Sequence, residues 1–352
     1  MRRAFRCVLA TSVAGALVMV ACQSSNTRRV SELKHGSTTS AAPGTTAAPT
    51  TTAAPTTTTA PTITSAGAPT STSAGASTTA GSAALTSVVL DLVDRSRATV
   101  SHGKVIASSR ALTTTVWLPG GPAVPRPLIV FAHGYSVGVT PYVRVCEAWA
   151  RAGFVVAAPA FPLTDKAVAG ANLDENDMVN QPADVSFVIS ALLVADGGPA
   201  GAVRGAIDGS RIAVAGHSDG ADTALDVTYL PSDRDARIRA SIVDAPDPLP
   251  LSAGAARVVS DVPLLLVHGD ADQIAPYSGS QQLLTQLAAP GWFLTLRGAD
   301  HLSPIAGPSP WTPTLDRVTT DFLDHVFSDP GTLGARLSAD VSGQPATLRA
   351  LG

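Results

Sequence analysis

The sequence predicts an α/β protein with one mainly parallel β-sheet and helices on both of its faces. Short apolar segments rich in β-branched or aromatic residues alternate with longer segments whose apolar residues recur at helical spacing. Strands that alternate with helices imply parallel neighbours in a sheet. Gly or Pro residues bound the short segments and predict the turns between them. The pattern extends over residues 85–330, which we expect to form one domain.

Seven segments are predicted as strands because they are short, apolar and bounded by turn residues. They are TTTVWL (113–118), PLIVFAHG (127–134), GFVVAAP (153–159), RIAVAG (211–216), ASIVDAP (240–246), PLLLVHGD (263–270) and WFLTLRG (292–298). Five segments between or after them have helical periodicity. They are YVRVCEAWARAG (142–153), ADVSFVISALLVAD (183–196), GADTALDVTYL (220–230), SQQLLTQLAA (280–289) and TLDRVTTDFLDHVF (314–327).

The N-terminus has the features of an export signal. Residues 1–21 contain three arginines, followed by an apolar run from residue 7, which is too short to favour a membrane span. The segment ends in LVMVAC, which resembles the lipobox of bacterial lipoproteins. This resemblance implies that Cys22 is lipidated and begins the mature chain, with the protein exported and anchored to the cell membrane. Met19 stands where Leu, Val or Ile is usual, so cleavage without lipidation stays open as an alternative.

Residues 22–84 are predicted to be a disordered linker. No Asp, Glu, Lys or Arg occurs between Lys34 and Asp91, and Thr, Ala, Ser, Pro and Gly dominate this stretch. Such a composition cannot bury enough apolar surface to offset the entropy lost on ordering. The linker would hold the domain away from a membrane or wall, or serve as an inert spacer. At the other end, residues 331–352 are small and polar, and we expect them to form a C-terminal tail.

Charge and cysteine content exclude several classes of protein. Without residues 1–21 the net charge falls from −3 to about −6, and no basic patch indicates a nucleic-acid partner. The three cysteines are Cys7, Cys22 and Cys146, so the predicted domain has no intramolecular disulfide. No Gly-rich phosphate motif follows the first strand and no Cys/His spacing fits a metal, so we expect no cofactor and no metal. The acidic run LDENDMVN (173–180) lacks the calcium-loop pattern and is expected to be a solvated loop.

The pattern G-x-S-x-G occurs twice, as GYSVG around Ser136 and as GHSDG around Ser218. A nucleophile elbow requires a buried strand, a sharp turn and a helix in direct succession. RIAVAG, HSDG and ADTALDVTYL follow this order without a gap, and glycines flank Ser218 where side chains would collide across a tight turn. After GYSVG the next helix is expected near Pro141, which places Ser136 on a longer loop. Ser218 is therefore the candidate nucleophile.

The elbow, together with FAHGY (131–135) at the end of an earlier strand, resembles the α/β-hydrolase superfamily. The resemblance implies the α/β-hydrolase fold and an oxyanion hole formed by the backbone N–H groups of Tyr135 and Asp219. The opening strands resemble those of secreted bacterial serine hydrolases related to dienelactone hydrolase, PAF-acetylhydrolase, chlorophyllase and polyester hydrolases. Dienelactone hydrolase has Cys where this chain has Ser218, and polyester hydrolases usually have Met in place of Asp219 and a C-terminal disulfide.

The remaining two members of a triad are expected after later strands. HGDADQIAP resembles the acid loop of the superfamily and selects Asp272, with Asp270 as the alternative or as a turn former. His301 lies in RGADHLSP after the last predicted strand, where the chain order Ser, Asp, His places the base. Of the seven histidines, His217 adjoins Ser218 but is expected to point elsewhere, and His268 lies in the strand before the acid loop.

These residues predict a serine esterase that acts on a small-molecule or lipid ester through an acyl-enzyme. An acyltransferase, a thioesterase, a peptidase and a tethered binding protein with an impaired site stay open as alternatives. The short stretch between residues 246 and 263 leaves no room for the large cap domain of many relatives, so the site is expected to be open unless residues 160–182 fold over it. The carboxylate of Asp219 either complements the helix N-terminus or lies at the pocket wall, where it would disfavour anionic substrates.

Overall fold

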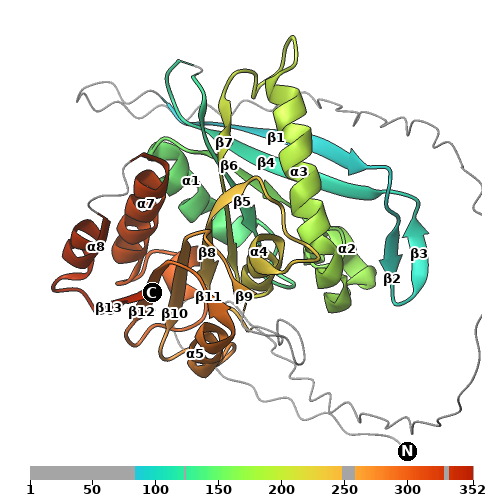
Figure 1. Cartoon of the computed structure of the whole chain (residues 1–352). Coiled ribbons are helices and arrows are strands. Elements are labelled where there is room, and N and C mark those ends of the chain that lie inside the picture. The colour runs from blue at the N-terminus through green and yellow to red at the C-terminus, as the bar shows by residue number, and fades with distance from the viewer. Residues whose placement is uncertain (1–83, 123, 248–257, 329–332, 352) are drawn as a thin grey trace, which may run out of the picture. The chain divides into compact units, whose positions relative to one another are not determined.

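The computed structural model describes residues 84–122, 124–247, 258–328 and 333–351. Within these residues nine strands form one sheet (Figure 1). In spatial order they are β1 (Thr86–Asp94), β4 (Arg110–Leu118), β6 (Val155–Pro159), β5 (Arg126–Ala132), β7 (Ile207–His217), β8 (Ile238–Asp244), β10 (Leu264–Gly269), β12 (Gly291–Leu296) and β13 (Ala346–Leu351). The short strands β2 (Thr99–Ser101) and β3 (Lys104–Ala107) form a separate pair, as do β9 (Val258–Val259) and β11 (Leu287–Ala288).

The sheet is mainly parallel, as the sequence predicts. The six neighbouring strands from β6 to β12 pair in parallel. Antiparallel pairing occurs only toward its two ends in the described part of the chain, where β4 joins β1 to β6 and β13 pairs with β12. The loops that follow the parallel strands therefore meet at one edge of the sheet, where ligands bind in open α/β folds.

Helices cover both faces of the sheet. The α-helices are α1 (Val143–Arg151), α2 (Lys166–Ala169), α3 (Gln181–Asp196), α4 (Asp219–Tyr229), α5 (Tyr277–Gln286), α6 (Ser303–Ala306), α7 (Thr312–Ser328) and α8 (Leu333–Val341), and the 3₁₀ helices are η1 (Thr140–Tyr142), η2 (Gly170–Asn172) and η3 (Glu175–Asn180). Side chains of α3 and α4 pack in one apolar core, and those of α1 and α7 in another. Strand β5 contributes to both cores because its side chains alternate, with Leu128 on one face and Ile129 on the other.

The stretch Glu175–Asp196, which comprises η3 and α3, is long and apolar enough to cross a membrane by length and composition. In this fold α3 is a core helix. Its residues Val185, Val188, Ile189 and Leu192 are fully buried, and they belong to the apolar core that includes side chains of β5. Burial against the sheet therefore accounts for the apolar character of the helix.

The expectation of a C-terminal tail is wrong for the described residues beyond 330. Residues 333–341 form α8, which buries Leu337, and residues 346–351 form β13, which pairs along the whole of β12. Leu333, Leu337 and Val341 recur every four residues, which is helical spacing that the small and polar composition of the segment conceals. The domain predicted over residues 85–330 therefore extends to include α8 and β13.

Other predicted boundaries are not covered by the structure. The predicted signal peptide (1–21), Cys22 and the linker (22–84) lie outside the described residues, apart from Ala84. Between β8 and β10 the described residues contain only the short strand β9 and no inserted helical domain, and residues 248–257 lie outside them.

A buried ion cluster attaches the segment before α3 to the sheet. Arg110 of β4 is 1% exposed, and its guanidinium donates to Asp177 at 2.7 and 2.9 Å and to Asp184 at 2.6 and 2.8 Å. Arg97 donates to Asp184 as well. The expectation that residues 173–180 form a solvated loop is therefore wrong for Asp177, which is 3% exposed because Arg110 neutralises it.

Candidate active site

Ser218 lies in a sharp turn between β7 and α4. Its backbone has φ 58° and ψ −129°, a conformation that L-residues adopt only when the surrounding structure imposes it. The flanking glycines show how tight the turn is. A Cβ on Gly216 would lie 1.9 Å from the carbonyl oxygen of Gly220, and a Cβ on Gly220 would lie 2.1 Å from the carbonyl oxygen of Ala132. The strand, turn and helix predicted around Ser218 are present, and the Ser218 side chain is half-buried.

The second serine pentapeptide has a different geometry. Ser136 follows β5 on a loop, its backbone N–H donates to Thr164 at 2.7 Å, and η1 begins only at Thr140. Ser136 also has a positive φ, at 67°, but no helix begins directly after it. It therefore lacks the direct succession of strand, turn and helix that Ser218 has.

Asp272 and His301, which are 29 residues apart in the sequence, are in direct contact. Asp272 Oδ2 lies 2.6 Å from His301 Nδ1, while Asp272 Oδ1 accepts from the backbone N–H groups of Ile274 and Ala275 at 2.8 and 3.0 Å. Burial acts to raise the pKa of Asp272, but hydrogen bonds from His268 and His301 outweigh it and hold that pKa well below its usual range. A carboxylate can only accept, so Nδ1 of His301 carries its proton and Nε2 is left to accept one.

Ser218 and His301 belong to neighbouring segments. The structure records no hydrogen bond between the two side chains within the described residues. His217, which precedes Ser218, lies with its ring centroid 4.5 Å from that of His301, and its Nε2 is 2.7 Å from the His301 carbonyl oxygen. Catalytic hydrogen bonds are often long in unliganded enzymes and shorten only with substrate bound. The contacts of His217 therefore place the loop that carries His301 beside the elbow that carries Ser218.

The turn that follows β5 approaches Ser218 closely. A Cβ on Gly134 would lie 3.1 Å from Ser218 Cβ and 3.0 Å from the Tyr142 hydroxyl, so only glycine fits without displacement. His133 Nε2 accepts from the backbone N–H of Phe161 at 3.1 Å, so its Nδ1 carries the proton and donates to the Gly134 carbonyl at 2.9 Å. In a trans peptide the C=O and N–H groups point in opposite directions. This bond therefore aims the N–H of Tyr135 away from His133.

Tyr135 and Asp219 are thus carried by two separate segments that both adjoin Ser218. Asp219 is the first residue of α4, where backbone N–H groups have no partner within the helix. Two N–H groups placed beside a nucleophile in this way can stabilise an oxyanion.

The carboxyl group of Asp219 is mostly buried. Burial, followed by the charges of Glu175 and Asp247, raises its pKa to about 7, while a contact with its own backbone N–H acts in the opposite direction. Its Oδ2 is buried and has no hydrogen-bond partner among the described residues. Burial also raises the pKa of Asp222 in the same helical turn. A helix N-terminus alone would lower both pKa values, so burial and neighbouring acids outweigh the helix dipole here.

Asp270, the alternative acid, has a separate role. Its Oδ1 accepts from the backbone N–H of Gly298 at 2.6 Å and thereby joins the ends of two neighbouring loops. Within the described part of the chain, no three His, Cys, Asp or Glu side chains form a group that could hold a metal ion.

Three residues beside the predicted triad were not assigned a role from the sequence. His268 lies with Nε2 3.3 Å from Asp272 Oδ2 and 3.0 Å from the Ala275 carbonyl oxygen. The His217 ring lies against the ring of His301, and its Nε2 contacts the His301 carbonyl oxygen. Tyr142 Oη lies 2.9 Å from His217 Nδ1. His217 lies within the GHSDG elbow and His268 within the HGDADQIAP acid loop, so either could have been noticed from the sequence. No sequence pattern indicates a role for Tyr142.

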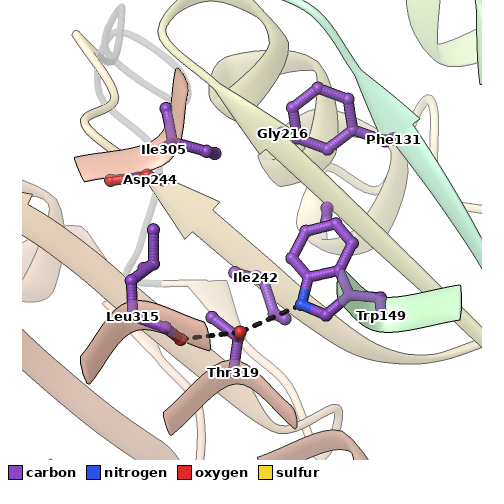
Figure 2. Close-up of a pocket in the computed structure, with 9 residues that line it drawn as sticks. Phe131, Trp149, Gly216, Ile242, Asp244, Ile305, Leu315 and Thr319 are labelled. Carbon is purple, nitrogen blue, oxygen red and sulfur yellow. Dashed lines mark hydrogen bonds between the residues drawn. The ribbon is translucent and has the colours of Figure 1, made fainter. Parts of the chain in front are cut away.

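A small pocket lies beside Gly216 of the elbow. Figure 2 shows it between Gly216, Asp244, Ile305 and aromatic residues of β5 and α1, and its volume is about 10 Å³. Trp149 Nε1 donates to the Thr319 hydroxyl at 2.9 Å in its wall. The pocket is lined mainly by apolar core side chains and is too small for a substrate acyl group.

Comparison with known proteins supports the same superfamily. The family model of Chlorophyllase, a family of α/β-hydrolases, matches residues 100–269. The matched part runs from β2 to the end of β10 and includes Ser218, Tyr135 and Asp219 but neither Asp272 nor His301. No curated protein matches the chain.

Proposed function

We propose that this chain, which is an α/β-hydrolase of the branch that includes the Chlorophyllase family, is a serine esterase that works through an acyl-enzyme. The observation that carries the proposal is the 2.6 Å contact between Asp272 and His301, next to an elbow that presents Ser218. The family match supports a hydrolase, and the proposal adds the triad and the ester substrate.

The proposed reaction begins when the Ser218 hydroxyl attacks the ester carbonyl carbon. His301 Nε2 takes the hydroxyl proton, and the backbone N–H groups of Tyr135 and Asp219 stabilise the negative charge on the carbonyl oxygen. The C–O bond to the alcohol then breaks, and His301 returns the proton to the departing alcohol. Asp272 keeps the imidazole in the required tautomer and stabilises its cation.

Water completes the proposed cycle. His301 removes a proton from a water molecule, which attacks the acyl carbon and releases the carboxylic acid while Ser218 regains its proton. If another alcohol, a thiol ester or an amide took part instead, the same residues would catalyse acyl transfer, thioester cleavage or peptide cleavage. An ester is preferred to an amide because an alcohol leaves more readily than an amine, and the described residues between β8 and β10 add no domain over the site.

The test is hydrolysis of short p-nitrophenyl esters by the purified chain and by two serine variants. We expect Ser218→Ala to lower kcat by about a thousandfold or more, because the residual rate would come from binding and the oxyanion hole alone. Ser136→Ala is the matched control, since it removes the serine of the other G-x-S-x-G pentapeptide, and it should keep the wild-type rate. Equal activity of Ser218→Ala and wild type would refute the proposal.

A fluorophosphonate probe separates an enzyme from a binding protein with an impaired site. One phosphonyl group per chain, attached to Ser218 and absent from Ser218→Ala, is the expected result. A chain that is not labelled would be a tethered binding protein instead, with a substrate-like ligand and no turnover. Thioester, peptide and acyl-acceptor substrates offered to the active protein then identify the group transferred.

We further propose that the protein is exported and held at the outer face of the cell membrane by a lipid on Cys22, with residues 22–84 as a tether. The support is the sequence alone, namely three arginines, an apolar run and a small residue before the cysteine. The substrate would then be a small-molecule or lipid ester outside the cell. Cys22→Ala should release the protein into the medium, and wild-type protein found mainly in the medium would refute the anchor.

A further inference from the structure

We propose that Tyr142 and His217 are positioning residues that hold the oxyanion turn, the elbow and the His301 loop at a fixed spacing. The inference rests on the proposed function, since it concerns the same reaction. It is carried by three consecutive hydrogen bonds that connect these segments, and it gives a role to two buried polar side chains that the reaction itself does not use.

The chain of contacts begins at the turn that carries Tyr135. The backbone N–H of Gly134 donates to Tyr142 Oη at 3.3 Å, and Tyr142 Oη lies 2.9 Å from His217 Nδ1. His217 Nε2 lies 2.7 Å from the carbonyl oxygen of His301. Tyr142 is fully buried and His217 is 1% exposed, so water does not compete for these bonds.

The partners determine where each proton lies. The carbonyl oxygen of His301 can only accept, so Nε2 of His217 carries a proton. Burial, followed by the nearby His301, lowers the pKa of His217 to about 3, so the ring is neutral and its Nδ1 accepts. Tyr142 must then donate its hydroxyl proton to Nδ1 while its oxygen accepts from Gly134. Every donor in the series therefore has one acceptor, and the hydrogen bonds all run in the same direction, from Gly134 through Tyr142 and His217 to His301.

The connected segments are far apart in the sequence and adjacent at the site. Gly134 precedes Tyr135, whose N–H is one of the two proposed oxyanion donors, and His217 precedes Ser218. His301 carries the proposed base on a loop after β12. An oxyanion donor is effective only within about 2.7–3.1 Å of the oxygen, so small displacements of these segments would slow the chemical step. The series supports this spacing from within the protein, because the buried side chains of Tyr142 and His217 do not reach the substrate.

The decisive variant is Tyr142→Phe, which keeps the ring packed against Phe131 and removes only the hydroxyl. Tyr229→Phe is the matched control, because Tyr229 is 2% exposed and its hydroxyl donates to the Val262 carbonyl, outside the described series. On a p-nitrophenyl ester we expect Tyr142→Phe to lower kcat about tenfold and to change KM by less than about twofold. Removal of an oxyanion donor lowers kcat by roughly 10²–10³, and a displaced donor should cost less than a removed one. Tyr229→Phe should keep the wild-type kcat.

Two variants of His217 separate the two halves of the series. The side-chain amide of His217→Gln can place its N–H near the former Nε2 and donate to His301, whereas His217→Asn reaches only the position of Nδ1 and the Tyr142 hydroxyl. We expect His217→Gln to retain at least about threefold more kcat than His217→Asn. Equal kcat values for the two variants would overturn the role assigned to the bond between His217 and His301.

A spectroscopic measurement distinguishes positioning from a general loss of stability. After reaction with a fluorophosphonate, the phosphonyl oxygen of the adduct on Ser218 occupies the place of the oxyanion. The ³¹P chemical shift of the adduct therefore reports hydrogen bonds from the N–H donors to this oxygen. The shift should move in Tyr142→Phe and stay unchanged in Tyr229→Phe. If kcat and the ³¹P shift of Tyr142→Phe match those of Tyr229→Phe, the proposal is wrong. A wild-type chain without Ser218-dependent turnover would overturn the proposed function first, and the positioning role with it.

Discussion

Replacement of Asp219 by Asn should change how the stability of the protein depends on pH. Burial and the charges of Glu175 and Asp247 raise the pKa of Asp219 from 3.8 to about 7. Between these two values the folded chain keeps a proton that the unfolded chain loses. Wild-type stability therefore falls as the pH rises from about 4 to about 7 through this one group, and the full loss is present above pH 7.

The size of the effect follows from the two pKa values. A difference of one in pKa corresponds to about 1.4 kcal/mol, so 3.8 and about 7 give roughly 4 kcal/mol as an upper limit. Asp219 is partly exposed, and solvent screening reduces this to about 2–3 kcal/mol. Asn has nearly the same shape and never ionises. Asp219→Asn should match wild type near pH 4 and be about 2–3 kcal/mol more stable at pH 8.

Urea unfolding of both chains at intervals between pH 4 and pH 8 measures this difference directly. Other carboxyls that titrate in the same range, such as Asp226 with its pKa raised to about 6 by burial, are present in both chains and largely cancel. Asp261→Asn serves as the control because the Asp261 side chain is 95% exposed. A constant difference in unfolding free energy between Asp219→Asn and wild type over this pH range would refute the reasoning.

Three further changes test other parts of the structure. Gly220→Ala would place a Cβ 2.1 Å from a backbone carbonyl of β5, so we expect a loss of at least about 3 kcal/mol in unfolding free energy or no soluble protein; wild-type stability by urea unfolding would contradict the geometry. Asp272→Asn should lower kcat by about 10³–10⁴ because His301 loses its tautomer control, with ester hydrolysis as the assay. Arg110→Met leaves the buried Asp177 carboxylate without a guanidinium and Asp184 with that of Arg97 alone, and calorimetry should show a loss of about 3–5 kcal/mol.

The parts of the structure that follow from local pattern could be predicted from the sequence. The parallel strands and the strand–turn–helix succession around Ser218 depend on residues adjacent in the chain, so the apolar runs and Gly216 and Gly220 were sufficient to locate them. Asp272 and His301 could be selected because each follows a recognisable strand. The structure brings these two side chains together, while their catalytic roles stay predictions.

Contacts between distant segments could not be predicted. Arg110 and Asp184 are 74 residues apart, and Tyr142 and His217 are 75 residues apart, so no local spacing connects either pair. The acidic run that contains Asp177 has the composition of a solvated loop. Only the contact with Arg110, which is distant in the sequence, explains why Asp177 is buried. The C-terminal helix and strand were missed because composition was given more weight than the four-residue spacing of Leu333 and Leu337.

Strand β13 affects how readily two copies of the protein can pair through the edges of their sheets. It occupies the edge beside β12 over Gly291–Leu296. A chain shortened to residue 330 would leave the N–H and C=O groups on this side of β12 without partners, beside apolar side chains such as Phe293 and Leu294. An unpaired apolar edge is a template for a strand from another molecule. Strand β13 now forms this edge of the sheet, and its exposed Arg349 places a charge there that β12 lacks, so β13 makes the edge a poorer template for another strand.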